Sequence, residues 1–516
     1  MPKIKIIHSL LQKKVLFFVL FALIISVFSQ ALFFRWTNDD AFISYRYVKN
    51  LTSGEGLVFN PGEKVEGFSN FLWVIMLSFL DFLGFPPLWS SKIISFCISL
   101  LMILLIFRTA QAFGLNKFIS GLCSLTLSLS SGLAYFSMSG METVFYTLLL
   151  LLAIYINEKY ENKPTKKIFN TLYGILFAVA IARPEGILLL FISTIYHLFK
   201  KIISKKGIYL KTILRVQFIY FLIYIFLMIL RYLYYSDILP NAYYAKPKGT
   251  FVEQGYSAFY TNFMNALLSG SFLLIPIFIL LVKYCKKYTF PYLILVGQLI
   301  FMFYAGDWMA FGRFFLPILP IVITLIALLS QETFLRARPP YFNKLVIFSS
   351  VIIWIFYSAG NVYQTHSALP NKNKYPYLVM NSQSLIELGK NLSQNYPLKT
   401  TIAVRRIGAI SYYSNLRIID ILGLTDKKIA YNIKNIKNIE TQNEVNSRIV
   451  LEKEPDLIIL FSFESDIAGY VYDKANPQYK LFEIEYLIFK NALNNGYKII
   501  EEKKFGSNEK MIILTK

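Results

Sequence analysis

The feature that most constrains this chain is a series of apolar runs, most of them about 15 to 22 residues long, that recur as far as about residue 360. A helix needs about 20 apolar residues to cross a bilayer core of roughly 30 Å. The runs lie near residues 14–34, 88–107, 118–135, 143–157, 168–182, 187–199, 216–230, 271–283, 288–304, 316–331 and 345–360. The sequence therefore predicts a polytopic α-helical membrane protein with about eleven transmembrane helices.

One further apolar run, "FLWVIMLSFLDFLGF" at 71–85, contains Asp81 and ends at Pro86 and Pro87. A short apolar segment that is broken in this way favours a helix at the membrane interface over a span. Lys92 follows near the start of the next span, where we expect its ammonium group to snorkel to the interface.

The net charge of +23 follows from topology in this interpretation and does not require nucleic acid as a partner. If the N-terminus is cytoplasmic, Lys and Arg far outnumber Asp and Glu in the inner connecting segments, whereas the outer loops are nearly balanced. This asymmetry is the positive-inside rule. The Ile-, Lys- and Asn-rich composition suggests a bacterial source. We therefore predict a multi-pass protein of the bacterial inner (cytoplasmic) membrane, and an odd number of spans places the C-terminal part outside the cytoplasm.

The cysteines give no sign of a metal site or a disulfide framework. Cys97, Cys123 and Cys285 each lie in or beside an apolar run, and none has metal-ligand spacing. The sequence thus predicts no cofactor and no resident metal, and it leaves open whether a divalent cation assists the acidic residues described below.

The composition changes at residue 361, after which the chain is mixed and polar. Short β-branched runs at 401–404, 456–461, 497–500 and 510–515 alternate with helix-like stretches such as 381–395 and 439–453. This alternation predicts an α/β domain. We therefore expect a transmembrane catalytic domain over 1–360 and an extracytoplasmic α/β domain over 361–516.

Five polar clusters fall at the outer mouths of the predicted spans. They are "NDDAFISYRY" (38–47), "SGMET" (139–143), "ARPEG" (182–186), "RYLYYSDILPNAYYAK" (231–246) and "AGDWMAFGR" (305–313). The inner loops, by contrast, are Lys-rich connectors. Any chemistry is therefore expected on the outer face of the membrane.

Two adjacent carboxylates, Asp39 and Asp40, stand where the chain leaves the first span. Thr37, Asn38 or Asp39 is able to cap a following helix, and acids at a helix N-terminus are ordinary. Capping needs only one carboxylate, and neighbouring side chains at a helix start diverge. We therefore expect one carboxylate of the pair to begin the helix and the other to serve as a base or to bind a cation.

The other clusters supply cations at the lipid–water boundary, namely Arg183, Arg231, Lys246 and Arg313. An arginine there can snorkel to lipid phosphate, but a guanidinium also binds a substrate phosphate through paired hydrogen bonds. Glu142, Glu185 and Asp307 either hold these cations or accept hydrogen bonds from sugar hydroxyls. Pro184 and Gly186 are expected to turn the chain.

These clusters, together with "GAISYYSNLRIIDILGLTD" at 408–426, resemble the GT-C glycosyltransferases related to the mycobacterial cell-wall arabinofuranosyltransferase AftB. The resemblance runs in the same order from about residue 35 to residue 426. It implies transfer of a sugar, with arabinofuranose as one candidate, from a polyprenyl-phosphate carrier to an extracytoplasmic glycan or glycoconjugate acceptor.

The resemblance also implies the catalytic residue. An acidic residue of the first external loop is the catalytic carboxylate in GT-C enzymes, which by position is Asp39 first and Asp40 second. From their charge and position, independently of the resemblance, Arg183, Arg231, Lys246 and Arg313 are the expected ligands of the donor phosphate. The expected sugar or acceptor ligands are Glu142, Glu185, Asp307, Trp308 and Tyr412. Tyr412 and Tyr413 suit a sugar-stacking surface or, alternatively, a buried strand end.

Two other functions remain open from the sequence. A transporter or a flippase of lipid-linked sugars predicts ionisable or helix-breaking groups near mid-membrane, and the predicted spans have few of them. A protein that binds the carrier lipid without catalysis is disfavoured only by the acidic pair. A turnover assay would separate these functions from transfer.

Overall fold

The structure is a computed structural model that describes residues 18–204, 208–245, 288–305, 311–336, 376–436, 438–463, 470–472, 480–505 and 509–516. The chain divides into two compact units. The helical unit comprises Met1–Trp36, Ser91–Phe226 and Thr250–Leu369. The mixed unit comprises Thr37–Ser90, Leu227–Gly249 and Pro370–Lys516.

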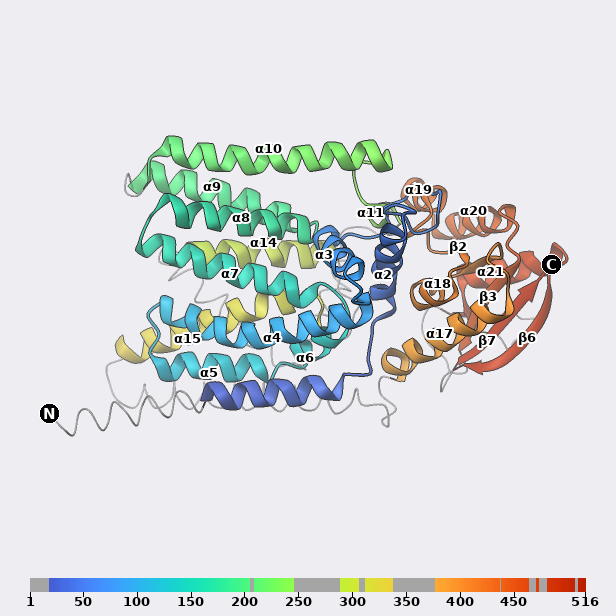
Figure 1. The fold of residues 1–516 in the computed structure, drawn as a ribbon, viewed down its shortest axis with the longest axis horizontal. Helices are drawn as coiled ribbons and strands as arrows, with labels where there is room; N and C mark the ends of the chain where they lie inside the picture. Colours follow the sequence, from blue (N-terminus) through green and yellow to red (C-terminus); the bar gives the residue numbers. More distant parts are fainter. Residues whose placement is uncertain are drawn as a thin grey trace. The chain divides into compact units, whose positions relative to one another are not determined.

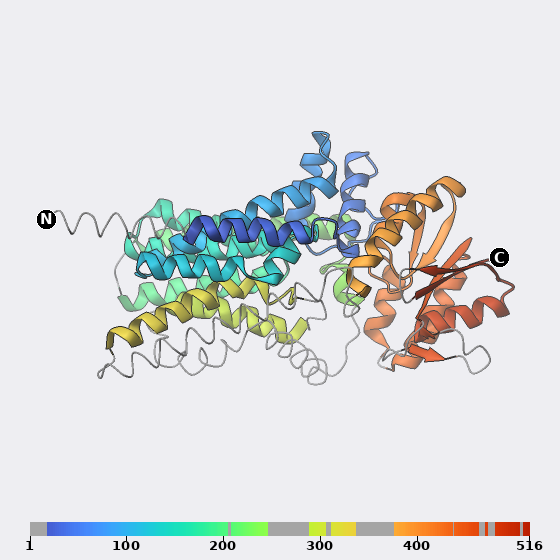
Figure 2. The same ribbon diagram turned by 90° about the horizontal axis from the view of Figure 1, so that it is seen from below.

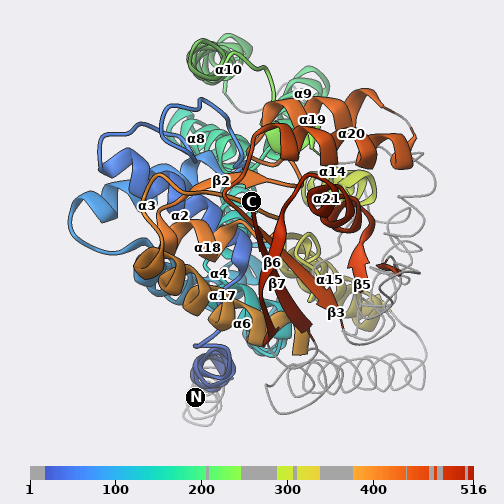
Figure 3. The ribbon, with the colours of Figure 1, turned by 90° about the vertical axis from the view of Figure 1, so that its right-hand side faces the viewer.

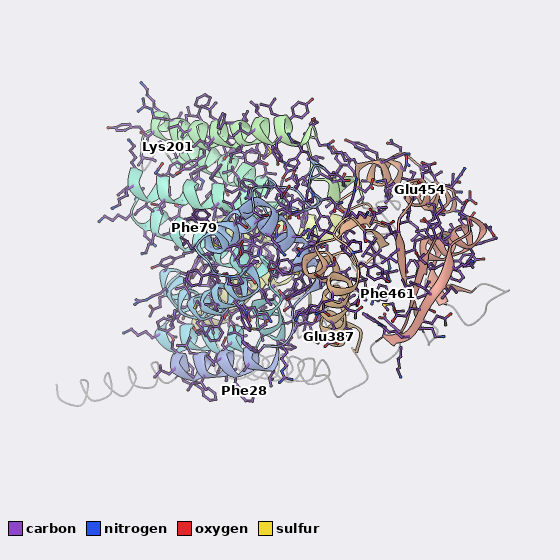
Figure 4. The ribbon with its side chains drawn as sticks, turned by 45° about the vertical axis from the view of Figure 1, so that its right-hand side comes forward. Phe28, Phe79, Lys201, Glu387, Glu454 and Phe461 are labelled. Carbon is purple, nitrogen blue, oxygen red and sulfur yellow. The ribbon has the colours of Figure 1, made fainter. Side chains whose placement is uncertain are left out.

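The helical unit is built from long apolar helices (Figure 1). They are the first helix Phe18–Leu32, α4 Pro87–Ala112, α5 Lys117–Ser128, α6 Ser131–Met138, α7 Thr143–Asn162, α8 Lys166–Ala182, α9 Gly186–Ser204, α10 Leu210–Tyr235, α14 Thr289–Ala305, and α15 Leu319–Arg336 with the 3-10 turn η2 Leu316–Ile318 before it. The first four residues of α4 and the residues of α10 from Leu227 onward belong to the mixed unit. Figure 2 shows the first helix lying along the bundle, where Ala22 packs with Ile103 of α4 and Leu125 of α5. Its Phe28 points away from the neighbouring helices (Figure 4) and is 68% exposed, as expected of a side chain that faces lipid.

Among the described residues, α4, α9 and α10 are each long and apolar enough to cross a membrane. The pair α5 and α6, bent by 55° at its break, can form a further span. Every apolar run that falls within the described residues is helical, which confirms the polytopic helical fold. The runs at 271–283 and 345–360 lie outside the described residues, so the total of about eleven spans stays a prediction.

Lys92 does not snorkel to the interface. Its side chain is buried, and its ammonium group donates hydrogen bonds to the carbonyl oxygens of Phe34, at 2.7 Å, and Trp36, at 2.8 Å. Carbonyls of the segment just after the first helix thus satisfy the charge inside the protein. Lys92 therefore fixes the chain just before the acidic pair.

The mixed unit contains a five-stranded sheet in the order β2-β1-β3-β7-β6. Its strands are β1 Thr401–Val404, β2 Arg417–Asp420, β3 Leu457–Phe463, β6 Lys498–Phe505 and β7 Glu509–Thr515, and β4 Tyr470–Tyr472 pairs with β5 Lys480–Phe482 separately. β1 is parallel to both β2 and β3, whereas β7 is antiparallel to β3 and β6. All four predicted strand runs are strands, and the α/β prediction is confirmed.

Helices cover both faces of this sheet (Figure 3). They are α17 Pro376–Asn395 and α18 Gly408–Ser414 on one face, and α19 Lys427–Asn435, α20 Ile439–Glu452 and α21 Glu483–Asn494 on the other. Alternate strand residues such as Ala403, Ile458 and Ile512 form a buried core with the helices of the second face. The β-branched strand runs are thus buried because both faces are covered.

The mixed unit also includes segments that lie far from the sheet in sequence. These are α2 Asp39–Thr52, α3 Phe71–Phe82 and the short helix α11 Asn241–Tyr244. Asn241 donates hydrogen bonds from its side chain to the carbonyls of Gly423 and Leu424. The grouping of residues 37–90 with the sheet was not foreseen from the sequence, and the boundary between 360 and 361 stays a prediction.

Candidate active site

Helix α2 begins directly at the acidic pair, and the capping residue is Asn38. The Asn38 side-chain oxygen accepts a hydrogen bond from the Asp40 backbone N–H at 2.9 Å, while Asp39 and Asp40 occupy the first turn. The prediction that one carboxylate of the pair begins this helix is therefore wrong, because the Asn38 amide takes that position. Both carboxylates remain in the first turn, where the helix dipole favours negative charge.

Asp39 makes its hydrogen bonds to a helix of the α/β domain instead. Its Oδ2 accepts from the Gly408 N–H at 3.1 Å and its Oδ1 from the Ala409 N–H at 2.7 Å, at the first residues of α18. Gly408 permits this approach, because a Cβ added there would clash with the backbone of Asp39. The carboxylate is thus held in a fixed orientation by groups 369 residues away in sequence.

Arg46 binds the other end of α18. Its buried guanidinium donates to the carbonyls of Ser411, at 3.0 Å, Asn415, at 3.3 Å, and Leu416, at 3.4 Å. Burial lowers the pKa of Arg46 to about 10, so it stays charged at neutral pH. An anion at the start and a cation at the end of a helix both complement its dipole. We call Asp39 and Arg46 the α18 clamp.

Burial of the carboxylate away from water raises the pKa of Asp39 from 3.8 to about 6. The hydrogen bond from the Ala409 N–H lowers this pKa and offsets only part of the increase. The neighbouring charge of Asp40 adds to the increase. The side chains of Asp39 and Asp40 are both half-buried. A carboxylate with a pKa close to neutrality is a better proton acceptor in a reaction than an ordinary aspartate.

The pKa of Asp39 gives a testable dependence of stability on pH. Between 3.8 and about 6 the folded chain binds more protons at this carboxylate than the unfolded chain. Its contribution to stability is therefore fully present below pH 3.8 and is lost as pH rises through 6. Relative to Asp39→Asn, the unchanged protein should be more stable at pH 5 than at pH 7.5. Thermal unfolding of both proteins at both pH values measures this, and a pH-independent difference would contradict it.

A second charged cluster lies at helix ends in the helical unit. The Arg183 guanidinium forms ion pairs with Glu142 and with Glu185, and Arg313 bonds Glu142 at 2.8 Å. Glu142 precedes α7, and Arg183 and Glu185 stand in the turn between α8 and α9. Of the two roles predicted for Glu142 and Glu185, the contacts in this structure fit that of holding arginines. The turn lies at Pro184 and Glu185, and Gly186 begins α9, where an added Cβ would clash with the Val179 backbone.

The members of this cluster differ in their access to solvent. Burial alone would raise the pKa of Glu142, but the charges of Arg313 and Arg183 outweigh it and lower the pKa to about 2. The Arg183 side chain is 6% exposed, whereas that of Arg313 is 17% exposed. Arg313 is therefore the cation of this cluster with more surface available to a ligand.

The remaining predicted site residues are spread over the mixed unit or lie outside the described residues. Arg231 forms an ion pair with Glu66, whose pKa burial raises to about 7. Lys246, Asp307 and Trp308 lie outside the described residues. Asp39, Asp40 and Arg231 belong to the mixed unit, and the Glu142 cluster belongs to the helical unit.

Tyr412 and Tyr413 lie in the helix α18, so the alternative of a buried strand end is wrong. Both rings pack against Phe42 of α2 at 5.7 Å between ring centroids, and Tyr412 also contacts Tyr45. Each tyrosine is half-buried. These contacts show Tyr412 as part of the packing between α2 and α18, and its predicted contact with sugar stays a prediction.

The sequence interpretation missed Arg46 and Gly408. Arg46 stands seven residues after Asp39, which places both on one face of a helix, so spacing could have paired them. Gly408 follows the strand run "TIAV" by a few residues, a signal for a tight strand-to-helix turn. Among the described residues, no group of three or more His, Cys, Asp or Glu side chains is arranged to hold a metal ion.

Comparison with known proteins identifies the fold. A family described as "Domain of unknown function (DUF8728)" matches residues 375–508, and no curated protein matches the chain in sequence. ArnT from Cupriavidus metallidurans bound to undecaprenyl phosphate is similar in structure, with a TM-score of 0.57 and 11% identity over 97% of this chain and 98% of that one. The oligosaccharyltransferase of Archaeoglobus fulgidus tethered with an acceptor peptide gives 0.58 and 11% identity over 96% and 80%.

A further structure of the archaeal enzyme, AglB from Archaeoglobus fulgidus with an inhibitory peptide and a dolichol-phosphate, gives a TM-score of 0.54 at 12% identity, over 96% of this chain and 80% of that one. Likenesses at this level of identity establish the fold. The chain is therefore a multi-pass membrane protein with the helical fold of ArnT and AglB and a C-terminal mixed α/β domain.

Proposed function

We propose that the chain is a membrane glycosyltransferase that moves a sugar from a polyprenyl-phosphate donor to an extracytoplasmic glycan or glycoconjugate. The observation that carries this proposal is the likeness of fold over nearly the whole of both chains to ArnT bound to undecaprenyl phosphate. Arabinofuranose as the sugar rests on the resemblance to the AftB-related enzymes. The proposed lipid-phosphate donor is supported by the similar structures, which contain undecaprenyl phosphate and dolichol-phosphate.

We assign the reaction to Asp39, with Asp40 as its neighbour. The acceptor hydroxyl oxygen attacks the anomeric carbon of the sugar, and its proton passes to the Asp39 carboxylate. The bond from the anomeric carbon to the phosphate oxygen breaks, and the electron pair stays on the polyprenyl phosphate. The N–H groups of Gly408 and Ala409 orient the carboxylate without using all its lone pairs. Its pKa of about 6 suits it to accept a proton near neutral pH.

We assign the donor phosphate to Arg313 in preference to Arg183. A developing phosphate charge needs a cation that contacts the ligand, and the Arg313 side chain is the more exposed of the two. Arg183 instead compensates the buried carboxylates of Glu142 and Glu185. Arg231 and Lys246 remain further candidates for the phosphate.

A reconstitution assay tests the proposed function against the alternatives. Purified protein in vesicles receives a polyprenyl-phosphate sugar with a labelled sugar, together with a glycan acceptor. Transfer of label to the acceptor with release of polyprenyl phosphate supports the proposal. Movement of the lipid-linked sugar between leaflets without transfer would identify a flippase, and saturable binding without either would identify a carrier-lipid binding protein.

The proposed orientation predicts the labelling of two single cysteines. Lys201 lies in the last turn of α9, and Glu454 is an exposed residue before β3 (Figure 4). In a variant without Cys97, Cys123 and Cys285, Glu454→Cys should react in intact cells with a membrane-impermeant reagent. Lys201→Cys should react only after the cells are opened. Equal labelling of both in intact cells would contradict the orientation.

A further inference from the structure

The turn just before η2 contains two successive residues with a left-handed backbone. Phe311 and Gly312 each have a φ of 64°. Glycine adopts this conformation at no steric cost, whereas a bulky side chain makes it unfavourable. Among the residues that the structure describes, the other non-glycine residues with positive φ are Ser236, Asn415 and Glu454, so Phe311 has the largest side chain of the four. Such a conformation persists only where surrounding contacts hold it, and it is often found at functional sites.

Helix α6 supplies contacts that hold Phe311. The Phe311 ring lies 4.5 Å from the ring of the buried Tyr135, measured between centroids. The Phe311 carbonyl oxygen approaches Gly132 so closely that a Cβ added to Gly132 would lie 2.9 Å from it. Residues three apart on a helix share a face, so Gly132 and Tyr135 hold Phe311 from the same side of α6. Phe33, just after the first helix, adds a third ring, 5.9 Å from that of Phe311 and 5.6 Å from that of Tyr135.

The start of η2 fixes the other end of the turn. The Gly312 carbonyl oxygen accepts hydrogen bonds from the N–H groups of Phe315 and Leu316, both at 3.1 Å. A Cβ added to Gly312 would lie only 3.0 Å from the Cβ of Phe315. Arg313 is thus held between Phe311 and the first residue of η2. The backbone angles at 311 and 312 therefore decide the direction in which the Arg313 side chain leaves the chain.

The turn directs two side chains into the Glu142 cluster. The Arg313 guanidinium bonds the Glu142 carboxylate at 2.8 Å. The ring of the next residue, Phe314, contacts both guanidinium groups of the cluster, with its centroid 5.0 Å from that of Arg183 and 5.8 Å from that of Arg313. Guanidinium groups at these distances are attracted to the face of an aromatic ring. A change in the turn would therefore displace the Arg313 cation and the ring that contacts Arg183 together.

We propose that Phe311 is a positioning residue for Arg313. Its ring, packed against Tyr135 and Phe33, stabilises the left-handed turn that directs the Arg313 guanidinium to Glu142. Phe311 acts through Arg313 and not through contact with the donor. Binding of the donor phosphate by the positioned cation rests on the proposed function. The link from Phe311 to Arg313 concerns the folded chain alone and is tested separately.

A double-mutant cycle in unfolding tests this link without any ligand. Phe311→Ala and Arg313→Met are measured singly and together in one detergent. Phe311→Ala should destabilise the unchanged protein more than it destabilises Arg313→Met, because only the former also loses the bond from Arg313 to Glu142. Equal losses in the two backgrounds would overturn the proposal. If Phe311→Ala does not fold, Phe311→Gly takes its place in the cycle, because glycine tolerates the positive φ.

Binding of undecaprenyl phosphate to the purified full-length protein tests the consequence for the donor. Affinity should fall about tenfold or more in Phe311→Ala, the effect of losing one hydrogen bond to a charged group. The loss should be smaller in Phe311→Gly, because glycine adopts the turn without strain.

The same binding assay in the Arg313→Met background separates positioning from direct contact. Phe311→Ala should cause no further loss of affinity there. A further loss of the same size, or equal losses in Phe311→Ala and Phe311→Gly, would overturn the proposal. If the unchanged protein did not bind undecaprenyl phosphate, the proposed donor would be contradicted, and the unfolding cycle would decide the positioning role by itself.

Discussion

Asp39→Asn should reduce sugar transfer by about 10²-fold or more, the usual effect of losing a group that transfers a proton in the reaction. The Asn side chain retains one oxygen that can accept a hydrogen bond from Gly408 or Ala409, so the contact with α18 is weakened and not abolished. Donor binding should stay close to that of the unchanged protein. In the unchanged protein, kcat/KM should rise with pH through a pKa of about 6, and this limb should be absent in the residual activity of Asp39→Asn.

The matched control changes the other end of the α18 clamp. Arg46→Gln loosens α18 from α2 but leaves both carboxylates of the pair in place. If Asp39 acted only through the clamp, Arg46→Gln and Asp39→Asn would lose similar activity. Both variants would then also lack the rise of kcat/KM with pH. Asp40→Asn measured beside them shows which carboxylate carries the limb. Full activity in Asp39→Asn, Asp40→Asn and the double variant would leave the proposed reaction without a base.

Arg183→Met should destabilise the protein by about 3–5 kcal/mol, the range found when one partner of a buried ion pair is removed. Its guanidinium compensates two carboxylates, those of Glu142 and Glu185, which are both buried. The buried Oε2 of Glu185 already lacks a hydrogen-bond partner. Without Arg183, its Oε1 would lose the hydrogen bond from the guanidinium as well. Thermal or denaturant unfolding of the purified protein in one detergent measures the loss.

Arg313→Lys is the comparison, because it keeps the charge beside Glu142 and removes only the planar fork. Its unfolding should stay near that of the unchanged protein, while its affinity for a polyprenyl phosphate should fall. The reverse pattern, with a stable Arg183→Met that binds donor poorly, would assign the phosphate to Arg183. If both variants bound the donor as tightly as the unchanged protein, neither arginine of this cluster would belong to the donor site.

Most of the fold could be predicted from the length of the apolar runs and from the β-branched composition of the strand runs. The run "TIAV" is β1 over Thr401–Val404 as expected, and the apolar run at 71–85 is the separate helix α3, whose place at the membrane interface stays a prediction. Strand β2 was not predicted, because its sequence "RIID" holds only two β-branched residues between two charged ones, and the seven residues of α18 give too little periodicity to identify a helix. Their structure depends on tertiary contacts such as those of Arg46.

The site was harder to predict than the fold because its contacts are long-range. Charge and position pointed to Asp39 and Asp40, yet the cap of α2 is Asn38, and the bonds of Asp39 go to α18. Likewise the position of Arg183 suggested a ligand, and only the structure shows two carboxylates bound to it. Sequence identifies which residues are charged near the membrane, but it does not reveal which charges are already compensated by the protein.

The α18 clamp has a consequence for chimeric proteins. A C-terminal domain transplanted from a relative would carry its own version of α18 but would meet the Asp39 and Arg46 of this chain. Unless the spacing of those two charges matched the length of the incoming helix, each charge would be left without its partner. Residues 37–90 should therefore be exchanged together with residues 370–516, as one inherited cassette, even though more than 250 residues of the chain separate the two segments.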